Sequence, residues 1–175
     1  MWCRHYEARL IQCVRPWRYH AGWGPVNVIS GITAGLAAAS SLGVPLTHRD
    51  HAHGVVFVTG HAKPGSNGTD WRALPMAAQQ AWLTLGIYMG VSGAATIQQE
   101  LMKALHADTP VAIIENATLP HQRQAVCTLV ELQSNIVRAQ LANPSVIVVG
   151  DVSQRLLAAG LYSSTDGARP HWRSA

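Results

Sequence analysis

The chain has 175 residues, of which 48% are hydrophobic and 13% are charged, and its formal net charge is +4. This length suits one globular domain, which should bury roughly 70% of its unfolded surface. The arginines gather near the two ends of the chain, so no basic face is confined to one predicted helix and nucleic-acid binding is not favoured.

Cysteine usage and hydropathy indicate a protein of a reducing compartment. Cys3, Cys13 and Cys127 are an odd number without CxxC spacing, so no disulfide framework is predicted and the cytoplasm is the default location. The uncharged runs 21–47 and 73–99 are interrupted by Gly, Pro, Asn or Gln. Neither is a continuous apolar run of about 20 residues, as a membrane span requires, and the N-terminus has no apolar signal segment. We therefore predict no membrane partner.

Residues 1–23 differ from the rest of the chain. They combine Arg, Trp and Cys without helical or strand periodicity. We interpret them as an atypical basic segment, either a start-site or reading-frame artefact or a degenerate remnant. The alternative is a short basic arm that packs its Trp residues on the domain.

The ordered pattern begins in the next segment of the chain. Asn27 to Ile29 predicts a short buried strand, Gly31 to Thr33 a turn, and the following Ala, Ser and Leu residues a helix that ends at Gly43. A polar loop follows over residues 45–50. A helix so rich in Ala and Gly allows a backbone or a flat ligand to approach closely.

The remaining segments alternate between strands and helices. Strands are predicted at 55–59, 82–89, 111–115, 124–129 and 145–149, and the first is expected to be buried on both faces. Helices are predicted for a short stretch from Asp70 to Leu74, from Ser92 to Leu105, around Leu132, Ile136, Val137 and Leu141, and from Asp151 onward. Residues 60–69 read as a mobile flap and residues 163–175 as a polar, disordered tail. This order predicts an α/β layered sandwich over residues 24–162, with a mixed sheet and flanking helices.

Five motifs in order carry a resemblance to a known family. They are GITAG from Gly31, PLTHRD from Pro45, VVFVTGH from Val55, YMGVSGAATIQQEL from Tyr88 and PVAIIENAT from Pro110. Together they resemble the C-terminal subdomain of the tetrapyrrole methylases, in the uroporphyrinogen-III C-methyltransferase branch, over roughly residues 26–160.

The resemblance implies an enzyme that transfers a methyl group from S-adenosyl-L-methionine to a ring carbon of uroporphyrinogen III. Methylation at C2 and then C7 would give precorrin-2, on the route to sirohaem or cobalamin. Such a reaction depends mainly on aligning the methyl group with the ring carbon and on excluding water. The resemblance also implies a possible homodimer.

The family's cofactor contacts fall on Thr33 and Ala34 of GITAG, Met89 of YMG and Ala117 of ENAT. Without the resemblance, Thr33 would be read as a helix-start residue and Met89 as a core residue. No catalytic residue is predicted, because the Gly-rich loop and the acid/base residues of the family's first half have no counterpart here.

The LTHRD and VTGH stretches are the expected substrate side. A substrate with eight carboxylates would attract Arg49 and Lys63, with His48 and His61 as further hydrogen-bond donors. The alternative is a solvated polar loop in which Asp50 neutralises Arg49. A metal site of His48, Asp50, His51, His53 and His61 is a weaker interpretation, because the spacing matches no standard site, and no metal is predicted.

The missing residues lead us to expect that this chain is truncated and has negligible activity alone, since groups that act as a unit are lost together. The competing interpretations are a non-catalytic remnant or interaction module of the same fold, and another precorrin methyltransferase. The PLTHRD and VTGH stretches favour the uroporphyrinogen branch over the latter.

Overall fold

The computed structural model describes residues 31–61 and 68–158. Its strands are β1 (Gly54–Thr59), β2 (Leu83–Tyr88), β3 (Pro110–Glu115), β4 (Arg123–Thr128) and β5 (Ser145–Val149). Its helices are α3 (Ala34–Ser41), α4 (Ala73–Gln80), α5 (Ala94–Leu101), α6 (Leu132–Ala139) and α7 (Gln154–Ala158), with 3-10 turns η1 (Val91–Gly93), η2 (Leu129–Glu131) and η3 (Asp151–Ser153). The strand predicted at 27–29, the centre of the predicted flap, the basic segment and the tail lie outside the described residues.

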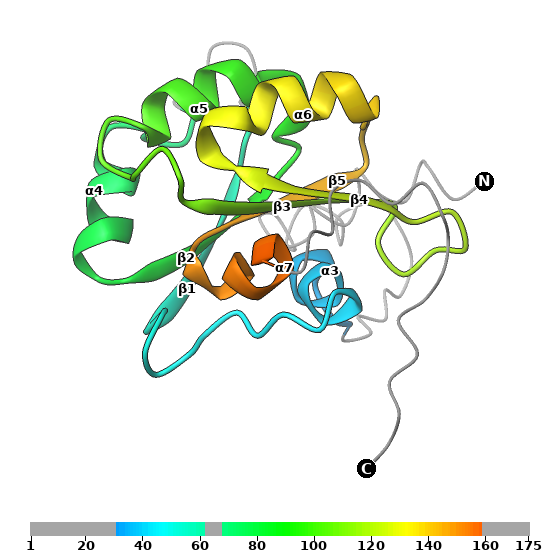
Figure 1. Ribbon diagram of the computed structural model, residues 1–175, viewed down its shortest axis with the longest axis horizontal. Helices are drawn as coiled ribbons and strands as arrows, with labels where there is room; N and C mark the ends of the chain where they lie inside the picture. Colours follow the sequence, from blue (N-terminus) through cyan, green and yellow to red (C-terminus); the bar gives the residue numbers. More distant parts are fainter. Residues whose placement is uncertain (1–30, 62–67, 159–175) are drawn as a thin grey trace, which may run out of the picture. The chain divides into compact units, whose positions relative to one another are not determined.

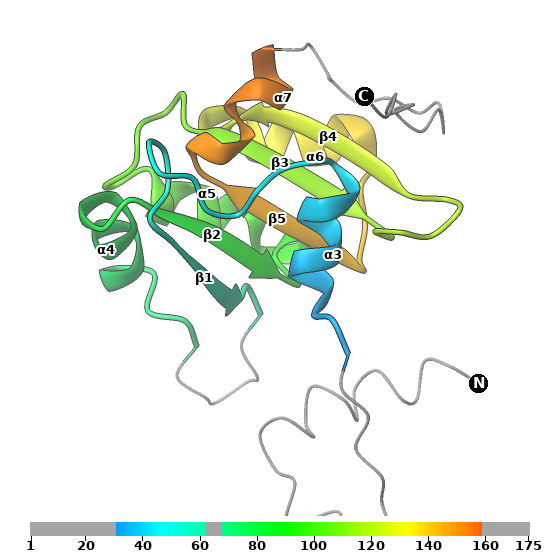
Figure 2. The same cartoon turned by 90° about the horizontal axis from the view of Figure 1, so that it is seen from below.

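The strands form one mixed sheet in the order β1-β2-β5-β3-β4. β1 and β2 are parallel, whereas β5 is antiparallel to both β2 and β3, and β4 is antiparallel to β3. Figures 1 and 2 show α4, α5 and α6 on one face of the sheet and α3 and α7 on the other. The layered α/β sandwich with a mixed sheet is therefore confirmed.

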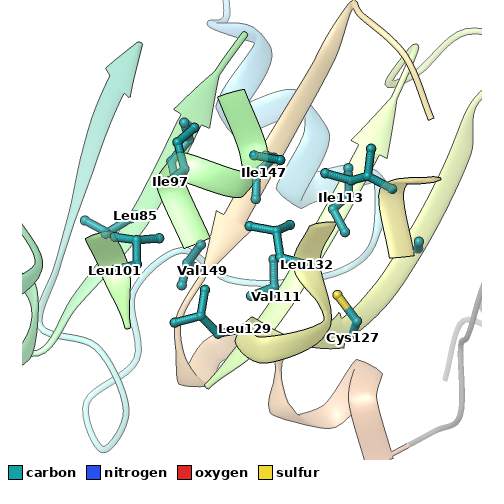
Figure 3. Packing of buried hydrophobic residues seen from close by; sticks show 14 of the residues in the cluster. Leu85, Ile97, Leu101, Val111, Ile113, Cys127, Leu129, Leu132, Ile147 and Val149 are labelled. Atoms are coloured by element: carbon teal, nitrogen blue, oxygen red, sulfur yellow. The ribbon is translucent and has the colours of Figure 1, made fainter. Parts of the chain in front are cut away.

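The larger part of the core lies between the sheet and α4, α5 and α6 (Figure 3). Alternate residues of the central strands point toward these helices and are fully buried, among them Leu85, Ile113 and Ile147. They meet Ile97 and Leu101 of α5 and Leu132 of α6. Burial of each such side chain contributes about 1.5–3 kcal/mol, so this layer supplies most of the driving force for folding.

Helix α3 packs against the opposite face through small residues, with Ala38 and Ala39 buried. Its end is a Schellman motif: Gly43 has φ +66°, its N–H donates to the Ser40 carbonyl at 3.0 Å, and the Val44 N–H donates to the Ala39 carbonyl at 3.0 Å. The predicted stop at Gly43 is confirmed, because that position requires a left-handed backbone.

Four sequence-based details need correction. β1 is only half-buried, because among residues 31–61 and 68–158 it is an edge strand that pairs with β2 alone. The helix capped by Asp70 extends to Gln80 rather than Leu74, although the cap is as expected, with Asp70 Oδ1 accepting the Arg72 and Ala73 N–H groups at 2.9 and 3.2 Å. Ser92 does not cap α5; its hydroxyl accepts from the Asn143 amide at 3.2 Å. Val137 is 64% exposed and lies outside the buried stripe of α6.

Cys127 of β4 is fully buried against α6 (Figure 3). Burial, with a smaller contribution from the Glu131 charge, raises the pKa of this thiol from 9.0 to about 12. Above pH 9 the unfolded chain therefore loses the thiol proton while the folded chain keeps it, so this group makes the free energy of unfolding fall as the pH rises from 9 toward 12.

We expect Cys127 to be unreactive toward a disulfide reagent such as DTNB at pH 8 until the chain unfolds. The measurement requires a Cys3→Ser, Cys13→Ser background, so that Cys127 gives the signal, with and without guanidinium chloride. In a Cys127→Ala variant of that background, the free energy of unfolding should fall less between pH 9 and 11 than it does with Cys127 present. Rapid labelling of the native thiol would contradict the packing.

Candidate functional site

Three strands end at the same edge of the sheet. Since β5 is antiparallel to β2 and to β3, the strands β1, β2 and β3 all run in one direction. The register places Thr59, Tyr88, Val146 and Ile114 in one row across the sheet. The residues that follow these strands therefore share one edge, here called the carboxyl edge, which is a common place for ligands in α/β proteins.

The backbone at the carboxyl edge is unusual. Met89 follows β2 with φ +53°, Asn116 follows β3 with φ +52°, and Thr118 has φ +67°. Left-handed conformations of residues other than glycine cost of the order of 1 kcal/mol or more, and they cluster at ligand sites. Loops with this backbone strain therefore follow two of the three strands that end at this edge.

Helix α3 begins at the same edge and is attached to β2 through a tyrosine. The Tyr88 hydroxyl lies 2.5 Å from Thr33 Oγ1 and accepts a hydrogen bond from the Gly35 N–H at 3.0 Å. The Tyr88 ring stacks on Phe57 of β1, with 5.6 Å between ring centres. The start of α3 is thus held beside the end of β2 (Figure 2).

The predicted cofactor residues all lie at the carboxyl edge. Thr33 and Ala34 begin α3, and Met89 directly follows Tyr88. Ala117 follows β3, and both Ala34 and Ala117 are half-buried against the α3 side of the core. Thr33 is exposed and Met89 is 37% exposed, so these two remain accessible to a ligand.

The structure divides the predicted substrate residues. His61 is exposed at the carboxyl edge, directly after β1, and its N–H donates to Thr59 Oγ1 at 3.4 Å. Lys63 lies outside the described residues. His48 and Arg49 belong to a turn closed by a bridge between His48 and Ala52, just before β1 begins. The six residues of β1 span about 20 Å, so His48 and Arg49 do not share a surface with His61.

The histidines near the start of β1 do not assemble a metal site. His48 and His51 have ring centres 4.7 Å apart, and His48 Nδ1 lies 3.8 Å from an Asp50 carboxylate oxygen. His53 stacks on Trp82 instead, at 5.6 Å. Within residues 31–61 and 68–158, no group of three or more His, Cys, Asp or Glu side chains could hold a metal ion.

Two surface hollows are present among the described residues. One of about 320 Å³ is lined by residues at the start of β3 and in η3. The other, of about 520 Å³, is lined by the segment before α4 and by residues of α5 and Lys103, and its Thr69 donates to the Thr59 carbonyl at the end of β1 at 2.7 Å. Neither is lined by a predicted site residue. At the carboxyl edge itself, Thr33, His61 and Met89 are exposed to solvent.

Sequence reasoning missed Tyr88 and Gly35 as site residues. Their signal was present: along β2, Tyr88 alternates with the buried Ile87 and so points to the α3 face, and Gly35 stands where the new helix must approach that face.

No helix among the described residues is long and apolar enough to cross a membrane.

Comparison with known proteins gives one consistent result. Residues 19–133 match the family described as Tetrapyrrole (Corrin/Porphyrin) Methylases. A siroheme synthase of Azotobacter vinelandii (strain DJ / ATCC BAA-1303) is 46% identical over 129 residues, which are 73% of this chain and 27% of that protein. The chain thus spans about a quarter of the length of the curated relatives that it matches.

Solved structures give the same family. The native form of uroporphyrin III C-methyl transferase from Thermus thermophilus is 27% identical, with a TM-score of 0.62 over 87% of this chain and 59% of that one. The enzyme of that name from the same organism, complexed with S-adenyl homocysteine, is 30% identical with a TM-score of 0.61, over 75% of this chain and 53% of that one.

Proposed function

Because this chain belongs to the tetrapyrrole methylase family, we propose that its carboxyl edge binds S-adenosyl-L-methionine and that the protein takes part in methylation of a tetrapyrrole. The observation that carries the proposal is the meeting of Thr33, Ala34, Met89 and Ala117 at this edge. The similar Thermus thermophilus enzyme complexed with S-adenyl homocysteine supports it.

The residues at the edge suit such a ligand. Ala34 and Ala117 carry small side chains, which leave neighbouring backbone groups accessible to hydrogen bonds from an adenine ring or an amino-acid portion. The partly exposed Met89 offers a polarizable apolar contact. The donor would supply an electrophilic methyl group, and the chain's own part is to hold and orient it.

The finer proposal is that the tetrapyrrole is uroporphyrinogen III, methylated at C2 and C7 to precorrin-2. The siroheme synthases among the relatives favour this branch over another precorrin methyltransferase. His61 is suited to bind a substrate carboxylate, because it is exposed at the same edge as the donor residues. His48 and Arg49 could contact only a distant part of a bound ligand or partner, about 20 Å away along β1.

Methyl transfer by this chain alone is expected to be negligible. Thr33, His61 and Met89 are exposed at the carboxyl edge, so a donor held there would keep contact with water on one side. A second surface is needed to close the site, and a homodimer or another part of a longer protein could provide it. The reducing cytoplasm suits such a protein, since Cys127 is a buried free thiol.

Titration with S-adenosylhomocysteine tests donor binding directly. We expect saturable heat with a dissociation constant below about 0.1 mM, roughly 5.5 kcal/mol of binding free energy. Met89→Asn should weaken binding about tenfold: asparagine tolerates φ +53°, so the fold is kept while the apolar contact is lost. Met102→Asn is the matched control, because Met102 is also 37% exposed but lies at the end of α5. No heat from a folded wild-type chain would overturn the proposal.

The alternative function is a non-catalytic module of the same fold. The exposure of Thr33 and Met89 favours it, because a complete donor site would cover these side chains. A folded chain that binds no S-adenosylhomocysteine but associates with an intact methylase would support this alternative.

A further inference from the structure

We propose that Tyr88 is a positioning residue that caps α3 and thereby holds the Thr33–Ala34 turn in its donor-binding geometry. The donor-binding part of this inference rests on the proposed function, whereas the contacts that show the capping are independent of that function. They lie between β2 and the first turn of α3.

The first turn of α3 lacks the side-chain cap that a threonine usually supplies at the start of a helix. Thr33 is the N-cap residue, with extended backbone angles of φ −64° and ψ 144°, and its side chain makes no capping hydrogen bond. In an ordinary cap the threonine oxygen would accept the N–H of the second or third helical residue. Here the N–H of Gly35, the second helical residue, donates to the Tyr88 hydroxyl at 3.0 Å instead.

The same hydroxyl fixes the Thr33 side chain. Tyr88 OH and Thr33 Oγ1 are 2.5 Å apart, so the phenol occupies the hydroxyl that would otherwise cap the helix. One oxygen at the end of β2 thus satisfies a free N–H of α3 and orients an exposed side chain predicted to bind the donor. Met89, another predicted donor residue, is the next residue in the chain.

Packing keeps the Tyr88 hydroxyl in place. The Tyr88 ring stacks on Phe57 with an angle of 21° between the ring planes, and Phe57 lies between Gly35 and Gly86. A Cβ atom on Gly35 would be 2.2 Å from the Phe57 ring and 2.6 Å from the Tyr88 hydroxyl. Absence of a side chain at this position allows the helix to approach the phenol closely enough for the hydrogen bond.

The test uses Tyr88→Phe in the full chain, which removes the hydroxyl and keeps the stacked ring. Amide hydrogen exchange by NMR should show the Gly35 N–H exchanging about tenfold faster than in the wild type, with the β2 amides unchanged. S-adenosylhomocysteine should bind about tenfold more weakly. Thr33→Val should weaken binding similarly. Thr33→Ser, which keeps the hydroxyl, should bind S-adenosylhomocysteine as tightly as the wild type.

Ser41→Ala is the matched control, since it removes a hydrogen bond of 2.8 Å, to the Ala38 carbonyl, at the other end of the same helix. It should leave both the Gly35 exchange and the affinity unchanged. Equal Gly35 exchange in wild type and Tyr88→Phe would overturn the capping role, and equal affinities would overturn the positioning role. If the wild-type chain bound no S-adenosylhomocysteine, the proposed function and the positioning role would fail together, whereas the capping role would still be decided by the exchange rates.

Discussion

Replacing Gly35 with alanine is expected to destabilise the fold by about 3 kcal/mol, near the upper end of overpacking effects, and to abolish donor binding. The new methyl group would lie 2.2 Å from the Phe57 ring and 2.6 Å from the Tyr88 hydroxyl. The Phe57 ring cannot move toward β2, because it already lies where a Gly86 side chain would be, 2.4 Å from a Cβ at that position. Alanine favours a helix over glycine by about 1 kcal/mol, which is too little to offset the clash.

Gly31→Ala is the matched control for this prediction. In residues 31–61 and 68–158, no atom lies within 4 Å of a Cβ at Gly31, so the free energy of unfolding should change by less than about 0.5 kcal/mol. Urea unfolding followed by circular dichroism measures both variants. Adding Phe57→Leu to Gly35→Ala should recover part of the loss, as a double-mutant cycle would detect. Equal stability of Gly35→Ala and wild type would show that α3 does not pack on Phe57 as described.

Replacing Arg123 with methionine is expected to cost about 3 kcal/mol, the cost of leaving a buried carboxylate without its partner. Arg123 Nη1 donates to the Glu115 carboxylate at 3.2 Å, and the Glu115 side chain is only 9% exposed. The same guanidinium donates to the Gln140 carbonyl at 3.0 Å and to the Ala139 carbonyl. It therefore also satisfies free carbonyl groups at the end of α6.

The 3-10 turn η2, which leads directly into α6, is fixed by a different set of hydrogen bonds. Thr128 and Glu131 form a capping box, and the hydrogen bond from the Thr128 hydroxyl, followed by that from its N–H, lowers the pKa of Glu131. Loss of Arg123 should therefore loosen the C-terminal turn of α6 first. Faster amide exchange near Gln140 than near Leu132 would identify this local effect.

Lys103→Met is the matched control for Arg123→Met. Lys103 pairs with Glu100 at 2.6 Å, but its side chain is 62% exposed, so its loss should cost less than about 1 kcal/mol. Combining Arg123→Met with Glu115→Gln should cost less than the sum of the two, since the second change removes the unpaired charge. If Arg123→Met lost no more stability than Lys103→Met, the Arg123 contacts with Glu115 and the end of α6 would not stabilise the fold as described.

Much of the local structure follows from the sequence because its causes are local. The bounds of the five described strands are predicted to within one residue, since runs of Val, Ile and Ala suit buried strands. Asp70 and Gly43 act where expected because a cap and a Schellman turn depend on a few adjacent residues. The donor residues Thr33, Ala34, Met89 and Ala117 were selected by motif, and the parallel directions of β1, β2 and β3 explain why such separate motifs meet.

The tertiary structure decided what depends on strand order and on contacts between distant segments. Among the described residues β1 pairs only with β2, so it is an edge strand and half-buried, which a hydrophobic run cannot indicate. His48 and Arg49 precede β1 and His61 follows it, so the two motifs lie at opposite ends of that strand although they are close in sequence. Tyr88 meets Gly35 across 53 residues, and Arg123 reaches the end of α6 across 17. Such pairs form because strand pairing and helix packing bring the groups together. Hydrophobic periodicity along the chain does not indicate which distant segments come into contact.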